Sequence, residues 1–436
     1  MMDLQRKKRS SRLYAVVTAV LLAGLAGGVI WLAFSILQPT PPRSVAMAVE
    51  PEGSFNSEAA KHYREILARS GIELKLVPST GAVESVARLN DAKSGINVAI
   101  IPSGITSEKA SPQLVSLGTL YYEPLWLFSR GGLVQRHEQL RTQRLSVGPE
   151  GSAGRALSLE FLARVGIIDQ RSGTLLALTP AEAAQKLQRG DIDTAILLDA
   201  WESRDVQQLL ASEEVELKSI RRADAFVALY PYLNKLVLPA GVANMAENRP
   251  PEDVLLVAPK ASLVVRSDLH PAIQYLLLEA ALEVHSEPGM FRSAGQFPAA
   301  ESIDLPLSRY ARQFYKSGSP FLQRHLPFWL AVLVEQMLVV VIPLFGLLYP
   351  LSRFAPAIYG WFERRRVYKL YTELKELEDE LAAVSGATGQ GFSQRLDELE
   401  ERASNLSVPA AFKPLLYALR LHIGMVREQN QKPSAH

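Results

Sequence analysis

FWLAVLVEQMLVVVIPLFGLLYPL, at residues 328–351, is the stretch that decides the architecture of this chain. It is apolar over more than the ~20 residues that a helix needs to cross a bilayer. A buried helix of a globular core is the alternative, but the length and the flanks of the stretch argue against it. The residues beyond it carry a cluster of positive charge: Arg353, Arg364, Arg365, Arg366 and Lys369. Because such charge marks the cytoplasmic side of a spanning helix, we predict a transmembrane helix at 327–351 and a cytoplasmic tail at 352–436.

A second membrane signal lies at the start of the chain. Residues 1–13 are basic, and residues 14–37 form an uncharged apolar run. The run is longer than the ~7–15-residue core of a cleavable signal peptide, and its end lacks the small-residue cleavage pattern. We predict an uncleaved transmembrane helix at 14–37, with a cleaved signal peptide as the alternative. Either way the chain exits the cytoplasm, so we expect residues 38–326 outside it and a lipid bilayer around both spans.

Composition excludes several classes of function. The 436-residue chain carries a net charge of +2, which gives no basic surplus for nucleic acid. It has no cysteine, and therefore no disulfide, thiol nucleophile or cysteine-based zinc site. It also lacks the P-loop, the Gly-x-Ser-x-Gly elbow and the His-Glu-x-x-His zinc motif. We therefore expect a protein that is not an enzyme and that has no metal and no cofactor.

The region between the two spans alternates between strand and helix patterns. The run Asn97–Ile101, NVAII, is fully apolar, as is typical of a strand buried on both faces of a parallel sheet. Other strands are predicted at 44–49, 73–77, 145–147, 193–198, 254–257 and 262–265, and helices at 56–69, 82–89, 153–165, 180–190 and 270–285. This alternation predicts an α/β domain, and its length predicts two lobes.

Three loops, each between a strand and the helix after it, are candidates for ligand binding. They are rich in small or hydroxyl residues and lie at Glu52–Phe55, Ser79–Ala82 and Gly148–Arg155. Free backbone N–H groups at a helix N-terminus favour an anion, and ligands of open α/β sheets lie at the carboxyl ends of strands. Arg155 has the geometry to hold a carboxylate through two parallel hydrogen bonds, with Glu150 as its alternative partner. Ordinary helix capping is the alternative for each loop alone.

The tail shows a helical repeat. Leu370, Leu374, Leu377, Leu381 and Val384 step by four and three, and Leu396, Leu399, Ala403 and Leu406 repeat the pattern after a Gly-rich break. This heptad spacing predicts a coiled-coil-like helical hairpin, followed by a third apolar helix after Pro414. Packing within the tail, self-association and a partner on these helices all remain open.

Six segments of the chain resemble the TAXI-type solute-binding subunits of TRAP transporters, in particular a membrane-tethered branch. They are GSFNSEAAKHYREIL (53–67), STGAVESVARL (79–89), LYYEPLWLFSR (120–130), VGPEGSAGRALSLEFLARVGI (147–167), PPEDVLLVAPKASLVVRSDLHPAI (250–273) and SPFLQRHLPFWLAVLVEQML (319–338). The resemblance implies a two-lobed periplasmic-binding-protein fold of type II. It also implies a small organic anion as ligand, such as a dicarboxylate or an amino acid, and a TRAP-type membrane transport subunit as partner.

The resemblance also implies which residues contact the ligand. In the first lobe these are Ser54, Phe55, Thr80, Gly81, Ser103 and Gly104. Tyr122 and Glu123 would lie near the hinge. The second lobe would contribute Ser152, Ala153 and Arg155, with Asp199 and Trp201 closing the far wall. The chain departs from the free-floating members of that family in its first loop, PEGSF, and in its two anchors and tail.

These observations predict a solute-binding receptor of the bacterial cytoplasmic membrane, with its main domain in the periplasm. Closure of two lobes around an organic anion would shift an open–closed equilibrium, and the receptor would deliver the anion to the transport subunit. A sensor that passes lobe closure through the spans to the helical tail is one alternative. An enzyme on the same fold is another.

Overall fold

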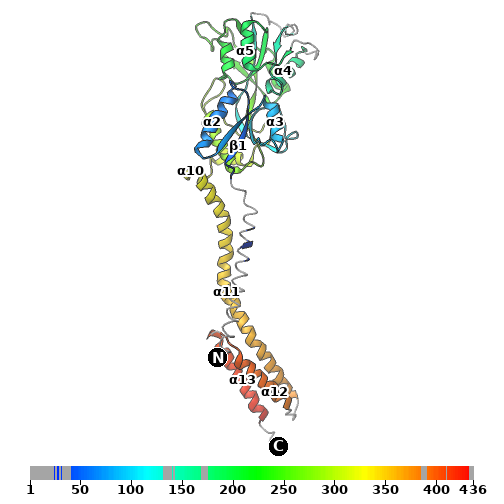
Figure 1. Cartoon of the computed structure of the whole chain (residues 1–436), viewed down its shortest axis with the longest axis vertical. Coiled ribbons are helices and arrows are strands. Elements are labelled where there is room, and N and C mark those ends of the chain that lie inside the picture. Colours follow the sequence, from blue (N-terminus) through cyan, green and yellow to red (C-terminus); the bar gives the residue numbers. More distant parts are fainter. Residues whose placement is uncertain are drawn as a thin grey trace. The chain divides into compact units, whose positions relative to one another are not determined.

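The computed structural model describes residues 24, 27, 28, 31, 41–130, 140, 143–167, 175–383, 390–408 and 410–431. The chain forms two compact units (Figure 1). One unit is Gln38–Glu335, and the other combines Met1–Leu37 with Gln336–His436. The first unit holds both sheets and is built from two lobes.

The first lobe is built on a six-stranded sheet. Its strands are β1 (Ser44–Val49), β2 (Glu73–Pro78), β3 (Val98–Pro102), β4 (Leu114–Tyr122), β10 (Leu233–Leu238) and β11 (Val254–Arg266). The order is β10-β11-β3-β1-β2, and β4 pairs with β11. β1 runs parallel to β2 and β3, whereas β11 runs antiparallel to β3 and β4. The carboxyl ends of β1 and β2, which precede two of the candidate loops, therefore lie at one edge.

Strand residues alternate between two cores in this lobe, as the two-residue period of a pleated strand requires. Met47 and Ile100 pack on one face with α2 (Phe55–Arg69), α8 (Pro271–His285) and α9 (Arg309–Ser317). Ala48 and Ile101 pack on the other face with α3 (Ala82–Asn90). Figure 1 shows α2 and α3 on opposite sides of β1. Two covered faces explain why these strands are apolar throughout.

The second lobe has its own five-stranded sheet, in the order β7-β6-β8-β5-β9. Its elements are β5 (Leu125–Arg130), β6 (Leu145–Ser146), β7 (Leu175–Leu176), β8 (Thr194–Leu198) and β9 (Val215–Lys218), with α4 (Ala153–Arg164), α5 (Pro180–Arg189), α6 (Arg204–Leu210) and α7 (Ala223–Leu229). Leu127 and Ile196 pack toward α4 and α7, whereas Phe128 and Leu197 pack toward α5 and α6. This lobe is therefore also a three-layer sandwich.

The chain crosses between the lobes at two adjacent places. The first crossing is Glu123-Pro124, between β4 and β5, and the second lies at Pro259-Lys260, inside β11. β10 and the part of β11 before this second crossing pack with the cores of the second lobe. The crossings are hydrogen-bonded to each other, since the Glu123 N–H donates to the Pro259 carbonyl at 3.0 Å. Two three-layer lobes joined by paired crossings form a two-sheet α/β fold of the periplasmic-binding-protein type.

Helices complete the chain. The first unit ends with α10 (Phe321–His325) and the start of α11 (Phe328–Ala383). α12 (Gln390–Asn405), a short 3-10 turn at Ala410–Phe412 and α13 (Lys413–Gln431) follow. In the second unit α11, α12 and α13 share one apolar core that includes Leu374, Leu399 and Leu419. The predicted helices of the tail are present in these residues, whereas coiled-coil geometry stays a prediction.

One helical segment in the described part of the chain, Phe328–Gly346, is long and apolar enough to cross a membrane by length and composition. It coincides with the stretch that opened the sequence analysis. The first predicted span, residues 14–37, lies outside the described residues except for 24, 27, 28 and 31, which are helical.

Two sequence predictions need correction. The predicted strands at 254–257 and 262–265 are one 13-residue strand, β11, because Pro259 lies where its lack of an N–H costs no ladder hydrogen bond and the strand continues between lobes. Five strands were not predicted: β4 and β5, which flank the Glu123-Pro124 crossing, and β7, β9 and β10.

Candidate functional site

A cavity of about 120 Å³ lies between the two lobes, at the carboxyl ends of their parallel strands. The first lobe lines it with the residues after β1 and β2, and the crossing contributes Glu123. The second lobe lines it with the loop after β6, the start of α5, the end of β8 and α6. The lining consists of Glu50, Pro51, Glu52, Ser54, Thr80, Glu123, Gly148, Pro149, Ser152, Ala153, Gly154, Thr179, Pro180, Ala181, Ile196, Leu197, Leu198, Asp199 and Asp205.

Three helices begin at this cavity. The Ser54 hydroxyl accepts a hydrogen bond from the Ser57 N–H and caps α2, and the Ser152 hydroxyl accepts one from the Arg155 N–H and caps α4. Thr179 and Glu182 form a capping box on α5, as its sequence predicts. Ser54 and Ser152 therefore cap helices, which was the alternative interpretation of their loops, and also line the cavity.

The loops of the two lobes touch beside the cavity. The Val83 N–H donates to the Gly151 carbonyl at 3.0 Å. A Cβ on Gly81 would lie 2.5 Å from the Ser152 Cα and 2.9 Å from the Gly151 oxygen. Only glycine at position 81 therefore lets the loops after β2 and β6 come this close. Gly81 acts on the spacing of the lobes and is not among the lining residues.

Two glutamates share one amide at the floor of the first lobe. The Asn56 amide nitrogen donates to Glu50 Oε2 at 3.0 Å and to Glu123 Oε1 at 3.4 Å. The Tyr121 hydroxyl donates in turn to the Asn56 carbonyl oxygen. This network fixes the orientation of the amide, so that its nitrogen faces the carboxylates.

Asp199, at the end of β8, is the most enclosed acid of the second lobe at the cavity. Its side chain is only 6% exposed. Oδ1 accepts hydrogen bonds from the Phe55 N–H at 3.3 Å and from the Ala200 N–H at 2.8 Å. Oδ2 is buried and has no hydrogen-bond partner among the described atoms. A carboxylate oxygen that borders a cavity without a partner is an available acceptor for a ligand.

Burial and crowding disfavour ionisation of these acids. Burial raises the pKa of Asp199 to about 7, although hydrogen bonds from its neighbours oppose the shift. Burial also raises the pKa of Glu123 well above its usual range, and the nearby Glu50 and Asp199 carboxylates add to the shift. The pKa values of Glu50 and Asp205 are raised by burial as well. The cavity therefore gains stability when these groups are protonated or meet positive charge.

Arg155 does not lie where the sequence analysis expected it. Among the described residues that line the cavity, none is a lysine, an arginine or a histidine. The guanidinium of Arg155 turns back on its own loop, where Nη1 donates to the Gly148 carbonyl at 3.3 Å. Its partner within the protein is thus the Gly148 carbonyl and not Glu150, whereas its contact with a ligand carboxylate stays a prediction.

The structure brings together six of the thirteen predicted contact residues: Ser54, Thr80, Glu123, Ser152, Ala153 and Asp199 line the cavity. Phe55 stands behind Asp199, with its ring against Tyr121 at 4.7 Å. Ser103 donates to the Lys260 carbonyl, and the Gly104 N–H donates to Asp304. Tyr122 packs against Phe297, and Trp201 packs against Trp126. These residues support the walls and do not line the cavity.

Sequence reasoning missed Glu50, Asp205 and the start of α5. Glu50 directly follows the apolar strand β1, so the rule that ligands lie at strand carboxyl ends was a signal that could have found it. Thr179 was identified only as a cap. No comparable signal pointed to Asp205, which comes from α6.

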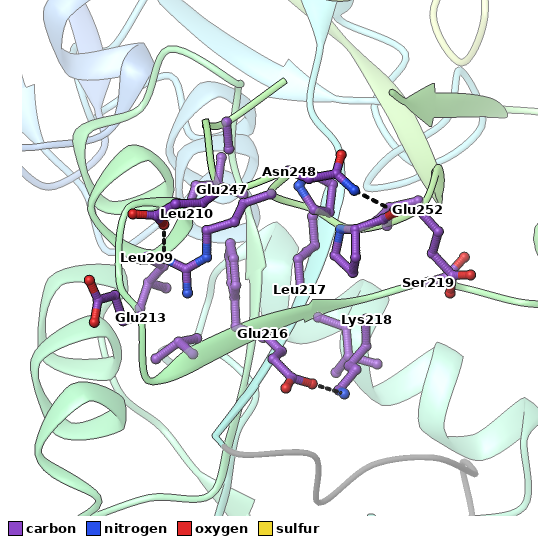
Figure 2. A pocket seen from close by; sticks show the side chains of 18 of the residues that line it. Leu209, Leu210, Glu213, Glu216, Leu217, Lys218, Ser219, Glu247, Asn248 and Glu252 are labelled. Atoms are coloured by element: carbon purple, nitrogen blue, oxygen red, sulfur yellow. Dashed lines mark hydrogen bonds and ion pairs between the residues drawn. The ribbon is translucent and has the colours of Figure 1, made fainter. Parts of the chain in front are cut away.

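A larger groove of about 850 Å³ lies on the second lobe alone, between the end of α6, β9 and residues 243–254 (Figure 2). Its charges are of both signs, and two ion pairs, Lys218–Glu216 and Arg249–Glu247, lie among them. It contains neither strand carboxyl ends from two lobes nor a buried acceptor without a partner among the described atoms. We therefore assign the candidate site to the cavity between the lobes.

No metal site competes with this assignment in the described residues. No group of three or more histidine or acidic side chains there is arranged to hold a metal ion.

The raised pKa of Asp199 predicts how stability depends on pH. A folded pKa of about 7 exceeds the ordinary value of 3.8, so the stabilising contribution of the protonated form is complete below about 3.8 and is lost as the pH rises through 7. The melting temperature of the ligand-free, full-length protein should therefore fall between about pH 4 and pH 7 and level off above that range. Asp199→Asn should reduce that fall, as measured by calorimetry. An equal fall in Asp199→Asn and wild type would contradict this assignment.

Comparisons with known proteins were made for the whole chain. A search of curated proteins found no match. Among solved structures, the aliphatic sulphonate binding protein SsuA of Escherichia coli matches with 14% identity and a TM-score of 0.35, over 70% of this chain and 83% of that one. An arginine-specific periplasmic binding protein of Salmonella typhimurium matches with 11% identity and a TM-score of 0.35, over 64% and 100%. A histidine kinase sensor domain similar to periplasmic binding proteins matches with 17% identity and a TM-score of 0.33, over 56% and 92%. At these scores, they inform neither the ligand nor the partner of this chain.

The comparison with protein families gives a longer match. Residues 57–317, which are more than half of the chain, match the NMT1-like family. The match covers nearly all of both lobes and supports the periplasmic-binding-protein type of the domain, while the TAXI-type affiliation stays a proposal. The chain belongs to the NMT1-like family.

Proposed function

We propose that the protein is a membrane-tethered, extracytoplasmic receptor that binds one small solute between its lobes. The observation that carries the proposal is the cavity itself, which both lobes line at the carboxyl ends of their strands. The crossings at Glu123-Pro124 and Pro259-Lys260 are the only covalent links between the lobes in the described part of the chain, so a hinge there opens and closes the cavity. Ligand binding then shifts the open–closed equilibrium.

The tether and the partner are part of the same proposal. The apolar helix Phe328–Gly346 would anchor the receptor in the bilayer, with the lobes in the periplasm and the tail in the cytoplasm. The resemblance to TAXI-type subunits supports delivery of the solute to a TRAP-type membrane transport subunit. The resemblance also suggested an organic anion, but the acidic lining without a basic side chain does not favour that charge.

A sensor is the second candidate, and a specific contact favours it. α2 begins at the cavity with Ser54 and ends near Gly71, where a Cβ would lie 3.1 Å from Trp329 Nε1 in the first turn of α11. Phe328 packs against the core of the first lobe. α11 then continues without a break to Ala383, within the helices of the tail. A movement of α2 on ligand binding would thus act directly on α11.

Gly81→Ala tests lobe closure. The added Cβ would overlap the backbone of Ser152 and hold the lobes apart, so ligands should stabilise this variant less than the wild type. The measurement is a thermal-shift screen of full-length protein in detergent with a broad set of metabolites, since a ligand of the folded state raises its melting temperature. Val83→Ala, which keeps the backbone N–H of the lobe contact, is the control. A screen in which no metabolite of any charge stabilises the wild type would contradict the receptor.

Trp329→Ala distinguishes the sensor from the plain receptor. Ligand should change the rate of tryptic cleavage in α12 and α13 of wild-type protein in nanodiscs, and Trp329→Ala should abolish that change while binding persists. Phe321→Ala, an exposed aromatic residue of α10, is the matched control. Cleavage of the tail that is indifferent to ligand in the wild type would rule out the sensor and leave the receptor.

The orientation in the membrane is tested with single cysteines, which the natural chain lacks. A cysteine at Ser212 should react with a membrane-impermeant thiol reagent in intact spheroplasts, whereas one at the exposed Ser404 should react only after lysis. Both positions are at least partly exposed in their own units, so reactivity reports the side of the membrane. Labelling of Ser404→Cys in intact cells would overturn the proposed topology.

A further inference from the structure

We propose that the cavity between the lobes binds a small organic cation, with an ammonium or amidinium group held by the Asp199, Glu50 and Glu123 carboxylates. The inference rests on the proposed receptor function and names the chemical class of its ligand. It follows from the hydrogen bonds that these acids lack, from the charge of the lining and from the size of the cavity.

The unused acceptor of Asp199 is the first argument. Oδ1 has two backbone donors, whereas Oδ2 of this cavity-lining residue is buried without a hydrogen bond among the described atoms, and the nearby Ser203 hydroxyl is the one side-chain group that acts on the carboxyl as a donor. Leaving such an oxygen without a donor costs free energy, because no protein group replaces its lost hydration. A ligand N–H that reaches Oδ2 would remove this cost, and a charged N–H would do so most strongly. A fully ionised carboxylate or sulfonate ligand has no donor to offer.

The paired glutamates are the second argument. Glu50 and Glu123 each accept one of the two N–H donors of the Asn56 amide, so that amide has no further donor for the remaining carboxylate oxygens. Both also line the cavity with Asp199. An ammonium group carries three donors and no acceptor, and an amidinium carries four N–H donors, so either matches several carboxylates at once.

The charge of the lining is the third argument. In the part of the chain that the structure describes, five of the lining residues are acids (Glu50, Glu52, Glu123, Asp199 and Asp205), and none is basic. Arg204 lowers the pKa of Asp205, but burial outweighs its effect. In their ionised form these acids would repel an anion, whereas a cation would offset their mutual repulsion and favour that form.

The size and the apolar part of the lining limit the rest of the ligand. The cavity holds about 120 Å³, which is small beside the ~300–1,000 Å³ of most ligand pockets. Ile196, Leu197 and Pro180 supply apolar contacts. The ligand is therefore a compact amine or amidine with a short hydrocarbon part.

The acids also predict the pH dependence of binding. The groups that act on Asp199 are Glu50 after β1, Glu123 and Tyr121 at the end of β4, and the hydroxyl of Ser203 before α6. Asp199, with a pKa raised by burial to about 7, is mostly protonated at pH 6 and mostly ionised at pH 8. Affinity for a cation should therefore rise about tenfold across that range, with release of a proton on binding.

The test compares three four-carbon probes on the full-length protein in detergent: putrescine, 1,4-butanediol and succinate. All three have a four-carbon chain; putrescine is positively charged, 1,4-butanediol is neutral and succinate is negatively charged. Putrescine should raise the melting temperature and give a measurable Kd by calorimetry, more tightly at pH 8 than at pH 6, whereas the other two should not. Agmatine and benzamidine extend the cationic set, and calcium chloride tests for a metal ion.

Asp199→Asn and Glu123→Gln should each weaken putrescine binding by about tenfold or more, since each removes a charge-assisted acceptor. The amide introduced by Asp199→Asn keeps an oxygen for the Phe55 and Ala200 N–H groups, so the fold should be retained. Glu213→Gln, an exposed acid of the second lobe outside the cavity, is the matched control and should bind as the wild type does.

The outcomes separate the ligand class from the receptor function. If succinate or butanediol raised the melting temperature and putrescine did not, the proposed cationic ligand would be wrong, whereas the proposed receptor function would stand. If calcium were the only probe that raised the melting temperature, the ligand would be a metal ion and the proposed organic cation would be wrong. If no amine or amidine binds, the inference fails, and the metabolite screen then decides separately whether the receptor function stands.

Discussion

The structure depends on the pairing of β4 with β11 where the chain crosses between the lobes. Tyr122 pairs with Lys260, and the Glu123 N–H donates to the Pro259 carbonyl. This register fixes Glu123 at the meeting point of both lobes, and β5 then carries the chain alongside β8, which Asp199 directly follows. Both acids therefore lie at the ends of sheet strands rather than on long loops, which gives a site the rigidity that binding needs.

Holding these carboxylates together has a cost that folding must offset. Asp199 and Glu123 are 6% and 4% exposed, and their pKa values show that burial opposes their charge. The apolar cores on both faces of each sheet supply the compensating stability, since they bury strands on two sides. Perturbed acids on a rigid scaffold are typical of functional sites, because a site that is optimal for binding is seldom optimal for stability.

The sequence predicts the parts of this fold whose signals are local. NVAII and the strand at 44–49 are apolar because both faces are covered, and the capping box at Thr179 begins its helix where expected. The resemblance located Ser54, Glu123 and Asp199, which line the cavity. The direction in which a side chain points depends on its neighbours in the fold and cannot be predicted from the local sequence. Arg155 stands in the right loop, yet its guanidinium donates to the Gly148 carbonyl and is not among the residues that line the cavity. Glu50 and Asp205 join Asp199 at the cavity only through the tertiary fold.

The helix α2 links the candidate binding site to the start of α11. Asp199 accepts a hydrogen bond from the Phe55 N–H, in the first turn of α2, so a ligand that engages Asp199 also acts on the helix whose far end meets Trp329. A cation near Asp199 would stabilise its ionised form, and an ionised carboxylate accepts a stronger hydrogen bond from the Phe55 N–H. Protonation of Asp199 weakens both. In the proposed receptor, occupancy of the cavity would thus be coupled to the position of α2 by one carboxyl group, provided that Oδ1 keeps its hydrogen bond from the Phe55 N–H while Oδ2 accepts one from the ligand.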